Sequence, residues 1–220
     1  MARPHLIIFD CDGVLVDSEP LANAVMKKYL TELGLPISLE RTMERFVGLS
    51  LATMRKMILS EDALDLPDDF EEEVLRRDQL AFTTDLKAIS GVSATLEALT
   101  LPKCVASSGG HEKIRTSLTL TGLLPYFDGK IYSAADVANG KPAPDLFLHA
   151  AHNMNTNPQD SLVIEDSLAG VQAGVAAGMR VFGFVGGGHI AEGHADRLLD
   201  AGALLVFEQM ADLAGHIAKL

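Results

Sequence analysis

Short apolar runs alternate with helix-like stretches along most of the chain, and this alternation constrains the fold more than any other feature. The runs are not broken by alternating polar residues, which is typical of strands buried on both faces of a parallel sheet. A strand followed by a helix, repeated along the chain, predicts an α/β fold with a doubly wound, mostly parallel sheet. The expected strands cover residues 6–9, 104–106, 130–132, 162–164, 181–184 and 204–207, and the expected helices cover residues 92–99, 112–120, 145–154, 169–177 and 210–217.

Residues 17–85 break this rhythm, because they contain helix-like stretches and no convincing strand. We expect an α-helical cap inserted between two parts of an α/β core, residues 1–16 and 86–220. Ligands of open α/β sheets bind beyond the carboxyl ends of the strands. An insertion that leaves the end of the first strand is therefore expected to overhang the site as a lid. Its expected helices cover residues 21–33, 39–47, 52–59 and 70–82.

Composition and charge restrict the partners and the compartment. Of the 220 residues, 48% are hydrophobic and 22% are charged, as in ordinary globular proteins. A net charge of −12 leaves no broad basic surface for a nucleic-acid backbone, so nucleic acid is not an expected partner. No apolar stretch approaches the roughly 20 residues of a membrane span or the apolar region of a signal peptide. Two cysteines without CxxC spacing suit a reducing compartment, so we expect a cytoplasmic protein. We also expect a monomer or a weak homo-oligomer.

The acidic pair Asp10 and Asp12 follows the first expected strand directly. Side chains two residues apart in an extended chain point the same way, so both carboxylates can face one cavity. Crowding of like charge is costly unless a cation lies between the groups or they share a proton. The pair therefore predicts a metal site, a raised pKa, or both. The alternative is a loop with two solvated aspartates.

Three further polar motifs follow apolar runs or precede helices. Ser107 and Ser108 come before two glycines, and hydroxyls with glycine amides at a strand end can hold an anion. Lys141 lies in a proline-rich loop before a helix, where it can act as a point charge on a phosphate. Glu165-Asp166-Ser167 ends another apolar run and precedes an Ala/Gly-rich helix. Taken singly, these motifs have plain alternatives, namely a turn, a solvated lysine and a helix N-cap.

Together and in this order, the four motifs resemble those of the haloacid dehalogenase superfamily of phosphotransferases. The likeness covers essentially the whole chain and is greatest to the branch whose helical cap lies between the first and second motifs. That branch includes β-phosphoglucomutase and sugar-phosphate phosphatases. The matching positions are Asp10-x-Asp12-Gly13-Val14, Ser107, Lys141-Pro142 and Glu165-Asp166.

The resemblance implies a role for each motif. Asp10 is expected to attack phosphorus and form an aspartyl-phosphate. Asp12 is expected to protonate the leaving alcohol and then to accept a proton from the hydrolytic water. Ser107 and Lys141 are expected to stabilise the charge of the transition state. The implied Mg²⁺ ligands are Asp10, the backbone carbonyl of Asp12, Asp166, and Glu165 near or in the coordination shell, and the implied phosphate-binding residues are Ser107, Ser108 and Lys141.

Two other chemistries fit the sequence less well. A halide leaves without a proton, whereas an alcohol leaving a phosphate ester benefits from an acid, so Asp12 favours phosphate over organohalide substrates. A signalling receiver domain also carries a phosphorylated aspartate. There an acidic pair precedes the phosphate acceptor and the domain is much shorter, whereas here the expected acceptor, Asp10, lies in the first motif.

Departures from the mutase pattern favour a phosphatase. β-Phosphoglucomutase has an arginine just after a Gly-x-Ser element of the cap, which grips the phosphate that is not transferred, and a histidine early in the first cap helix. Here Gly48-x-Ser50 is followed by Leu51, and Ala22 takes the place of the histidine. We therefore expect a magnesium-dependent phosphatase of a small phosphorylated metabolite, 6-phosphogluconate or a related sugar phosphate. The alternative is a phosphosugar mutase of the β-phosphoglucomutase type.

The histidines do not suggest a second metal. His149 and His152 are spaced for one helix face, and His189 and His194 flank a glycine-rich loop. Neither pair comes with a cysteine or carboxylate at the spacing of a zinc site. All four are predicted to be surface or packing residues.

Overall fold

The computed structural model describes residues 3–47, 49 and 51–220, which fold into two compact units. The core unit runs from the N-terminal segment to Asp17 and resumes at Lys87–Leu220. The inserted unit is Ser18–Leu86. Within the described residues, no helix combines the length and the apolar character that a membrane span requires.

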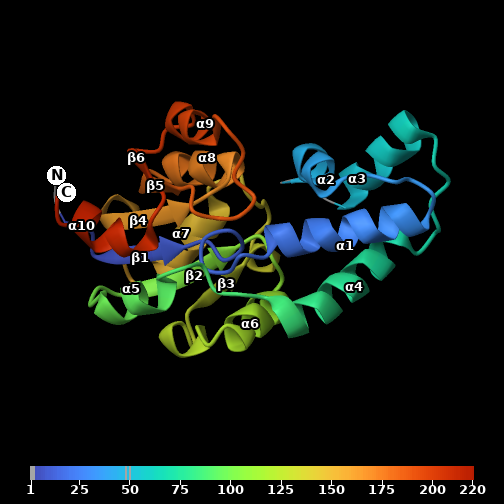
Figure 1. Ribbon diagram of the computed structural model, residues 1–220. Helices are drawn as coiled ribbons and strands as arrows, with labels where there is room; N and C mark the ends of the chain where they lie inside the picture. The colour runs from blue at the N-terminus through green and yellow to red at the C-terminus, as the bar shows by residue number, and fades with distance from the viewer. Residues whose placement is uncertain (1–2, 48, 50) are drawn as a thin grey trace. The chain divides into compact units, whose positions relative to one another are not determined.

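The core unit is built on a six-stranded sheet in the order β3-β2-β1-β4-β5-β6 (Figure 1). Every neighbouring pair is parallel, which confirms the predicted α/β class and the doubly wound sheet. Phe9, the last residue of β1, lies opposite both Val105 and Ile164, so the three central strands end within two residues of one another. The strands are β1 (Leu6–Phe9), β2 (Lys103–Ser107), β3 (Ile131–Ser133), β4 (Ser161–Glu165), β5 (Arg180–Phe184) and β6 (Leu205–Phe207).

The residues of β1 alternate between the two faces of the sheet and are fully buried on both. Leu6 and Ile8 belong to the apolar cluster that includes residues of α7 and α8. Phe9 points the other way, and its ring lies 6.0 Å from that of Phe127. Apolar side chains are therefore needed at every position of the strand, which explains its uninterrupted hydrophobic sequence.

Helices connect the strands of the core unit. The sequence analysis did not predict α9, which has seven residues and begins after Gly193, a residue at φ +74°. So short a helix, next to a glycine-rich loop, gives little helical periodicity to recognise. The expected helix 210–217 is also shorter than predicted, because its first turn, Met210–Asp212, is a 3₁₀ helix. The helices are α5 (Val92–Ala98), α6 (His111–Leu120), α7 (Asp145–Asn153), α8 (Leu168–Ala176), α9 (His194–Asp200) and α10 (Leu213–Ile217).

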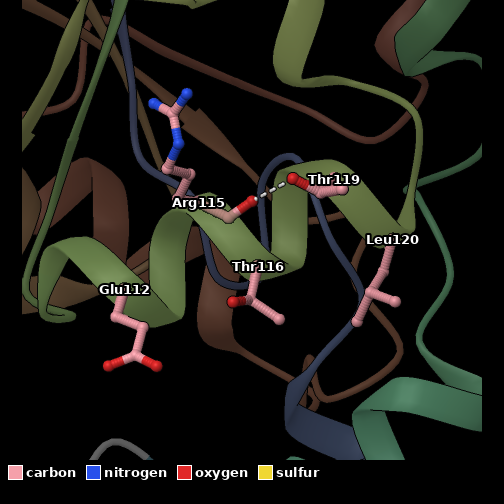
Figure 2. Close-up of a pocket in the computed structure, with 5 residues that line it drawn as sticks. All are labelled: Glu112, Arg115, Thr116, Thr119 and Leu120. Atoms are coloured by element: carbon pink, nitrogen blue, oxygen red, sulfur yellow. Dashed lines mark hydrogen bonds between the residues drawn. The ribbon is translucent and has the colours of Figure 1, made fainter.

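The surface of α6 carries a hollow of about 320 Å³ (Figure 2). Thr119 Oγ1 donates a hydrogen bond of 2.7 Å to the carbonyl oxygen of Arg115, one turn earlier. The lining side chains belong to the solvent side of the helix and include none of the motifs of the sequence analysis. They are Glu112, Arg115, Thr116, Thr119 and Leu120.

The inserted unit is helical, and its described residues contain no strand. Its helices pack around a small apolar cluster in which the rings of Tyr29 and Phe70 stack 5.5 Å apart. The expected helix 52–59 ends at Met57 and continues as a π-helical turn, Ile58–Asp62. Gly48 and Ser50 of the mutase comparison lie outside the described residues. The helices are α1 (Glu19–Glu32), α2 (Leu39–Phe46), α3 (Leu51–Met57) and α4 (Phe70–Asp85).

The chain leaves and re-enters the core unit at one place. The backbone N–H of Asp17 donates to the carbonyl oxygen of Lys87 at 2.9 Å, and Val16 forms an antiparallel bridge with Ala88. The two ends of the insertion are therefore joined at the end of the loop that follows β1.

Candidate functional site

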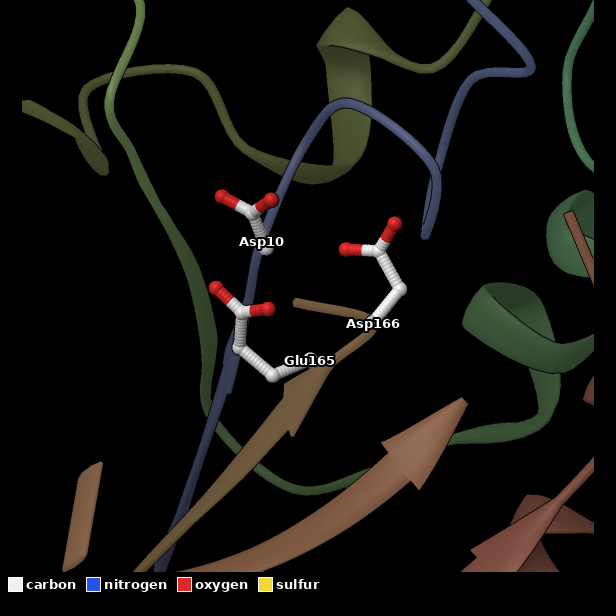
Figure 3. A group of neighbouring side chains, drawn as sticks. All are labelled: Asp10, Glu165 and Asp166. Carbon is white, nitrogen blue, oxygen red and sulfur yellow. The ribbon is translucent and has the colours of Figure 1, made fainter. Parts of the chain in front are cut away.

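Three buried carboxyl groups meet at the carboxyl ends of β1 and β4. Asp10 follows β1, its N–H donates to the carbonyl oxygen of Ile164 at 3.0 Å, and Glu165 and Asp166 come next along the chain. The pairing of the two strands thus places residues far apart in sequence side by side. One carboxylate oxygen from each of Asp10, Glu165 and Asp166 lies within 4.8 Å of the others, and the three groups turn toward a common space (Figure 3).

Lys141 joins two of these carboxylates. Its Nζ donates to Oδ1 of Asp10 at 2.8 Å and to Oε1 of Glu165 at 2.7 Å, and the side chain is only 4% exposed. Burial alone lowers the pKa of Lys141, but attraction to the two carboxylates outweighs burial, so the pKa is raised. The lysine is therefore held as a cation inside the site.

One lysine does not balance three carboxyl groups. Burial raises the pKa of Asp10 well above its ordinary value; Lys141 opposes the increase, and the charges of Glu165 and Asp166 add to it. Carboxylate oxygens are the ligands that Mg²⁺, Mn²⁺ and Ca²⁺ prefer. Three oxygens within reach of one ion, in a buried and negatively charged setting, fit a divalent cation of this kind.

Glu165 is bound on both of its oxygens. Besides the Lys141 contact, Oε2 accepts hydrogen bonds from the N–H and the hydroxyl of Ser167, at 2.7 and 2.9 Å. The Ser167 hydroxyl also accepts from the N–H of Gly170 at 3.0 Å, so this serine is the N-cap of α8. The capping alternative of the sequence analysis is thus correct for Ser167, while Glu165 and Asp166 lie in the acidic cluster.

Asp12 faces a different cation. Its Oδ2 accepts a hydrogen bond of 2.9 Å from Nζ of Lys113, in the first turn of α6. The side chain of Lys113 is 47% exposed and that of Asp12 is 19% exposed, so this pair lies nearer to solvent than the Lys141 pair. The Asp12 side chain does not belong to the cluster of three carboxylates among the described residues. Sequence reasoning missed Lys113.

The two serines of the second motif have different surroundings. Ser107 ends β2 and is buried, and its hydroxyl accepts from the N–H of Gly109 at 3.2 Å, as in a turn. The Ser133 hydroxyl donates to the carbonyl oxygen of Gly109 at 2.7 Å and ties this turn to β3. Ser108 is exposed. Because β2 pairs with β1, Ser107 lies at the same end of the sheet as Asp10.

Asp166 is contacted by two histidines, which the sequence analysis predicted to be surface or packing residues. His189 Nε2 lies 2.9 Å from Asp166 Oδ2, and His194 Nε2 lies 2.6 Å from the Asp166 carbonyl oxygen. The polar contacts with Asp166 were not predicted, but since His189 is buried and His194 is half-buried, both still fit the interpretation as packing residues. It is confirmed for the other two, because His152 is exposed and His149 packs on the ring of Tyr132.

Comparison with known proteins places the chain in one family. Residues 7–184 match the model of the haloacid dehalogenase-like hydrolases. The chain is 36% identical over 190 residues to 6-phosphogluconate phosphatase of Escherichia coli, with 86% of each chain covered. It is 31% identical over 206 residues to the phosphorylated carbohydrates phosphatase of Thermotoga maritima, with 90% of this chain and 91% of the relative covered.

A solved structure shares the fold over nearly the full length. It is a haloacid dehalogenase-like protein of unknown function from Agrobacterium tumefaciens, with a TM-score of 0.91 and 43% identity. The alignment covers 98% of both chains. The likeness therefore extends over both units of the chain.

Proposed function

The chain belongs to the haloacid dehalogenase-like hydrolase family and is a phosphoric monoester hydrolase, and from this premise we propose that it removes phosphate from a sugar phosphate such as 6-phosphogluconate. The observation that carries the proposal is the meeting of Asp10, Lys141 and the acidic pair Glu165 and Asp166 in one buried cluster. The substrate class is supported by the names of two relatives, one a 6-phosphogluconate phosphatase and the other a phosphatase of phosphorylated carbohydrates.

In the first step, a carboxylate oxygen of Asp10 attacks phosphorus. The bond between phosphorus and the sugar oxygen breaks, and Asp12 gives its proton to that oxygen, so the sugar leaves as an alcohol. The product on the protein is an aspartyl-phosphate. Asp12 is the candidate acid because Cys11 alone separates it from the nucleophile.

In the second step, water attacks the phosphorus of the aspartyl-phosphate. Asp12 accepts the proton of the water, the bond to Asp10 breaks, and inorganic phosphate leaves. The free Asp10 carboxylate and the protonated Asp12 are then ready for the next substrate. One carboxyl group thus serves as acid and base in turn.

Lys141 and Ser107 hold the phosphoryl oxygens in this proposal. Lys141 is already fixed between Asp10 and Glu165, so its charge lies beside the nucleophile without further ordering. A preorganised cation of this kind stabilises the charge that shifts onto the phosphoryl oxygens in a loose transition state. Ser107 offers its hydroxyl from the end of the neighbouring strand, and Ser108 is the second candidate in that loop.

We propose Mg²⁺ as the cofactor, held by Asp10, Asp166 and the backbone carbonyl of Asp12. When bound, the ion offsets the repulsion between the attacking carboxylate and the phosphate. Glu165 remains a candidate ligand near or in the shell. Its hydrogen bonds to Lys141 and Ser167 also give it a second role, that of anchoring the lysine.

The inserted unit is proposed to act as a cap that selects the leaving group. It leaves the core unit after Asp17, directly beyond the loop that carries Asp10 and Asp12. The absence of an arginine at Leu51 and of a histidine at Ala22 favours water over a second sugar hydroxyl as the acceptor. Hydrolysis is therefore preferred to the mutase reaction.

The test is phosphate release from a panel of sugar phosphates, with and without a chelator. The wild-type protein is expected to release phosphate only with Mg²⁺ present, and Asp10→Asn is expected to abolish release. Undiminished activity of the Asp10→Asn protein would overturn the nucleophile assignment. With β-glucose 1-phosphate and a trace of the bisphosphate, formation of glucose 6-phosphate instead of free phosphate would establish the mutase alternative.

A further inference from the structure

The segment after β5 brings two imidazoles to a single residue of the acidic cluster, His189 from the loop and His194 from the first position of α9. His189 contacts the Asp166 side chain, with 2.9 Å between Nε2 and Oδ2. His194 contacts its backbone, with 2.6 Å between Nε2 and the carbonyl oxygen. One segment of the chain thus contacts both the side chain and the backbone of Asp166. Neither histidine has a part in the reaction steps given above.

Glycines make room for the His189 ring where three loops meet. A Cβ on Gly13, in the loop after β1, would overlap the Asp166 carboxylate and lie 2.9 Å from Cε1 of His189. A Cβ on Gly187 would lie 2.9 Å from the same ring and 3.1 Å from the carbonyl oxygen of Gly13. The N–H of Gly188 donates to Oδ1 of Asp17 at 2.9 Å and ties the loop to the segment after β1. The imidazole is therefore held in one place by its surroundings.

We propose that His189 is a positioning residue for Asp166, whose hydrogen bond holds the carboxylate facing Asp10 and Glu165, where the proposed divalent cation would bind. The inference rests on the proposed metal role of Asp166. One oxygen of Asp166 is bound by His189, and Figure 3 shows the carboxyl group turned toward Asp10 and Glu165. A ligand fixed in this way loses less freedom when the ion binds. Loss of such outer contacts typically weakens metal binding by about 10- to 100-fold.

Two amide variants separate the hydrogen bond from simple packing. In His189→Gln the side-chain nitrogen reaches about as far as Nε2, whereas in His189→Asn it is one methylene too short. Both variants are polar and uncharged, and both remain smaller than the imidazole, so neither crowds the glycines around the ring. The matched control is His152→Gln, which makes the same substitution at an exposed histidine.

The measurement is Mn²⁺ binding to the full chain, followed by the electron paramagnetic resonance signal of the free ion. The Asn variant is expected to bind about tenfold or more weakly than the wild type, while the Gln variant and the His152 control bind within a few-fold. Thermal unfolding of each metal-free variant is recorded in parallel to establish that the protein is folded.

The outcomes distinguish this inference from the proposed function. A wild-type protein that binds no Mn²⁺ would overturn the proposed metal role and this inference with it. Binding as tight in the Asn variant as in the wild type would overturn the inference alone. Equal weakening in the Asn and Gln variants would also overturn it, because the position of the donor would then not matter.

Discussion

At the scale of single residues, the site depends on close contacts that leave no spare volume. Glu165 is completely buried, and both of its oxygens are used, one by Lys141 and the other by Ser167. Gly170 lies against this carboxylate, and a Cβ built there would overlap it. Gly170, at the start of α8, is therefore a requirement of the acidic cluster, although glycine is disfavoured inside a helix.

Gly170→Ala is expected to destabilise the protein despite the better helix propensity of alanine. Overpacking a buried site costs about 1–3 kcal/mol, which exceeds the gain of about 1 kcal/mol from replacing glycine in a helix. Urea denaturation monitored by circular dichroism measures the change. Gly215→Ala in α10, where a Cβ meets open space, is the control and should be neutral or stabilising. Equal stability of the Gly170 variant and the wild type would contradict this reading of the Glu165 environment.

At the scale of elements, α6 brings a second cation to the site. The turn before it is tied to β3 through Gly109 and Ser133, and the helix begins at His111, which contacts Asp136 at 2.8 Å. Lys113 then reaches Asp12 from the first turn. A lysine is unfavourable there, because the N-terminus of a helix carries partial positive charge. The contact with Asp12 offsets that cost. Helix α6 therefore positions a side chain of the site in addition to covering the sheet.

Lys113→Gln is expected to affect catalysis more than stability. A partly exposed ion pair contributes less than about 1 kcal/mol to folding, so the melting temperature should change little. We expect Lys113 to orient Asp12, the proposed acid. In the variant, kcat/KM should therefore fall about tenfold for a sugar phosphate and less for an aryl phosphate, whose leaving group needs no proton. Arg115→Gln, on the same helix, is the control. An equal fall for both substrates would argue against an orienting role.

The sequence predicted the elements whose pattern is local and missed those that depend on tertiary contacts. The uninterrupted apolar runs predicted the buried parallel strands, and the acidic residues at their ends predicted the carboxylate cluster. Lys113, His189 and His194 were missed because their partners lie in other loops. Two signals were nevertheless present: a lysine in the first turn of a helix, and a histidine after three glycines, which permit close approach of the backbone.

At the scale of the whole molecule, the chain passes from the core unit to the inserted unit and back through two adjacent segments. An isolated bridge between Val16 and Ala88 and the hydrogen bond between Asp17 and Lys87 join these segments. The candidate reactive groups Asp10, Asp12 and Lys141 all belong to the core unit. Chemistry and substrate selection can therefore be separated by removing the insertion.

Replacing residues 18–86 by a short Gly-Ser linker is expected to leave a folded core unit. Because the two ends already meet, the linker has little distance to span, and the parallel sheet keeps its strands. The shortened protein should hydrolyse a small aryl phosphate but lose its preference for sugar phosphates, as measured by the ratio of the two kcat/KM values. An unchanged ratio would show that the insertion does not select the leaving group.

The central claim is that Asp10 becomes phosphorylated during turnover. The most direct measurement is mass spectrometry of peptides from the protein after rapid acid quenching of a reaction with Mg²⁺ and a sugar phosphate. We predict one added phosphoryl group on the peptide that contains Asp10, and none in the Asp10→Asn protein or after chelation of the metal. Steady phosphate release by an enzyme in which no phosphoryl group is ever found on that peptide would contradict the account.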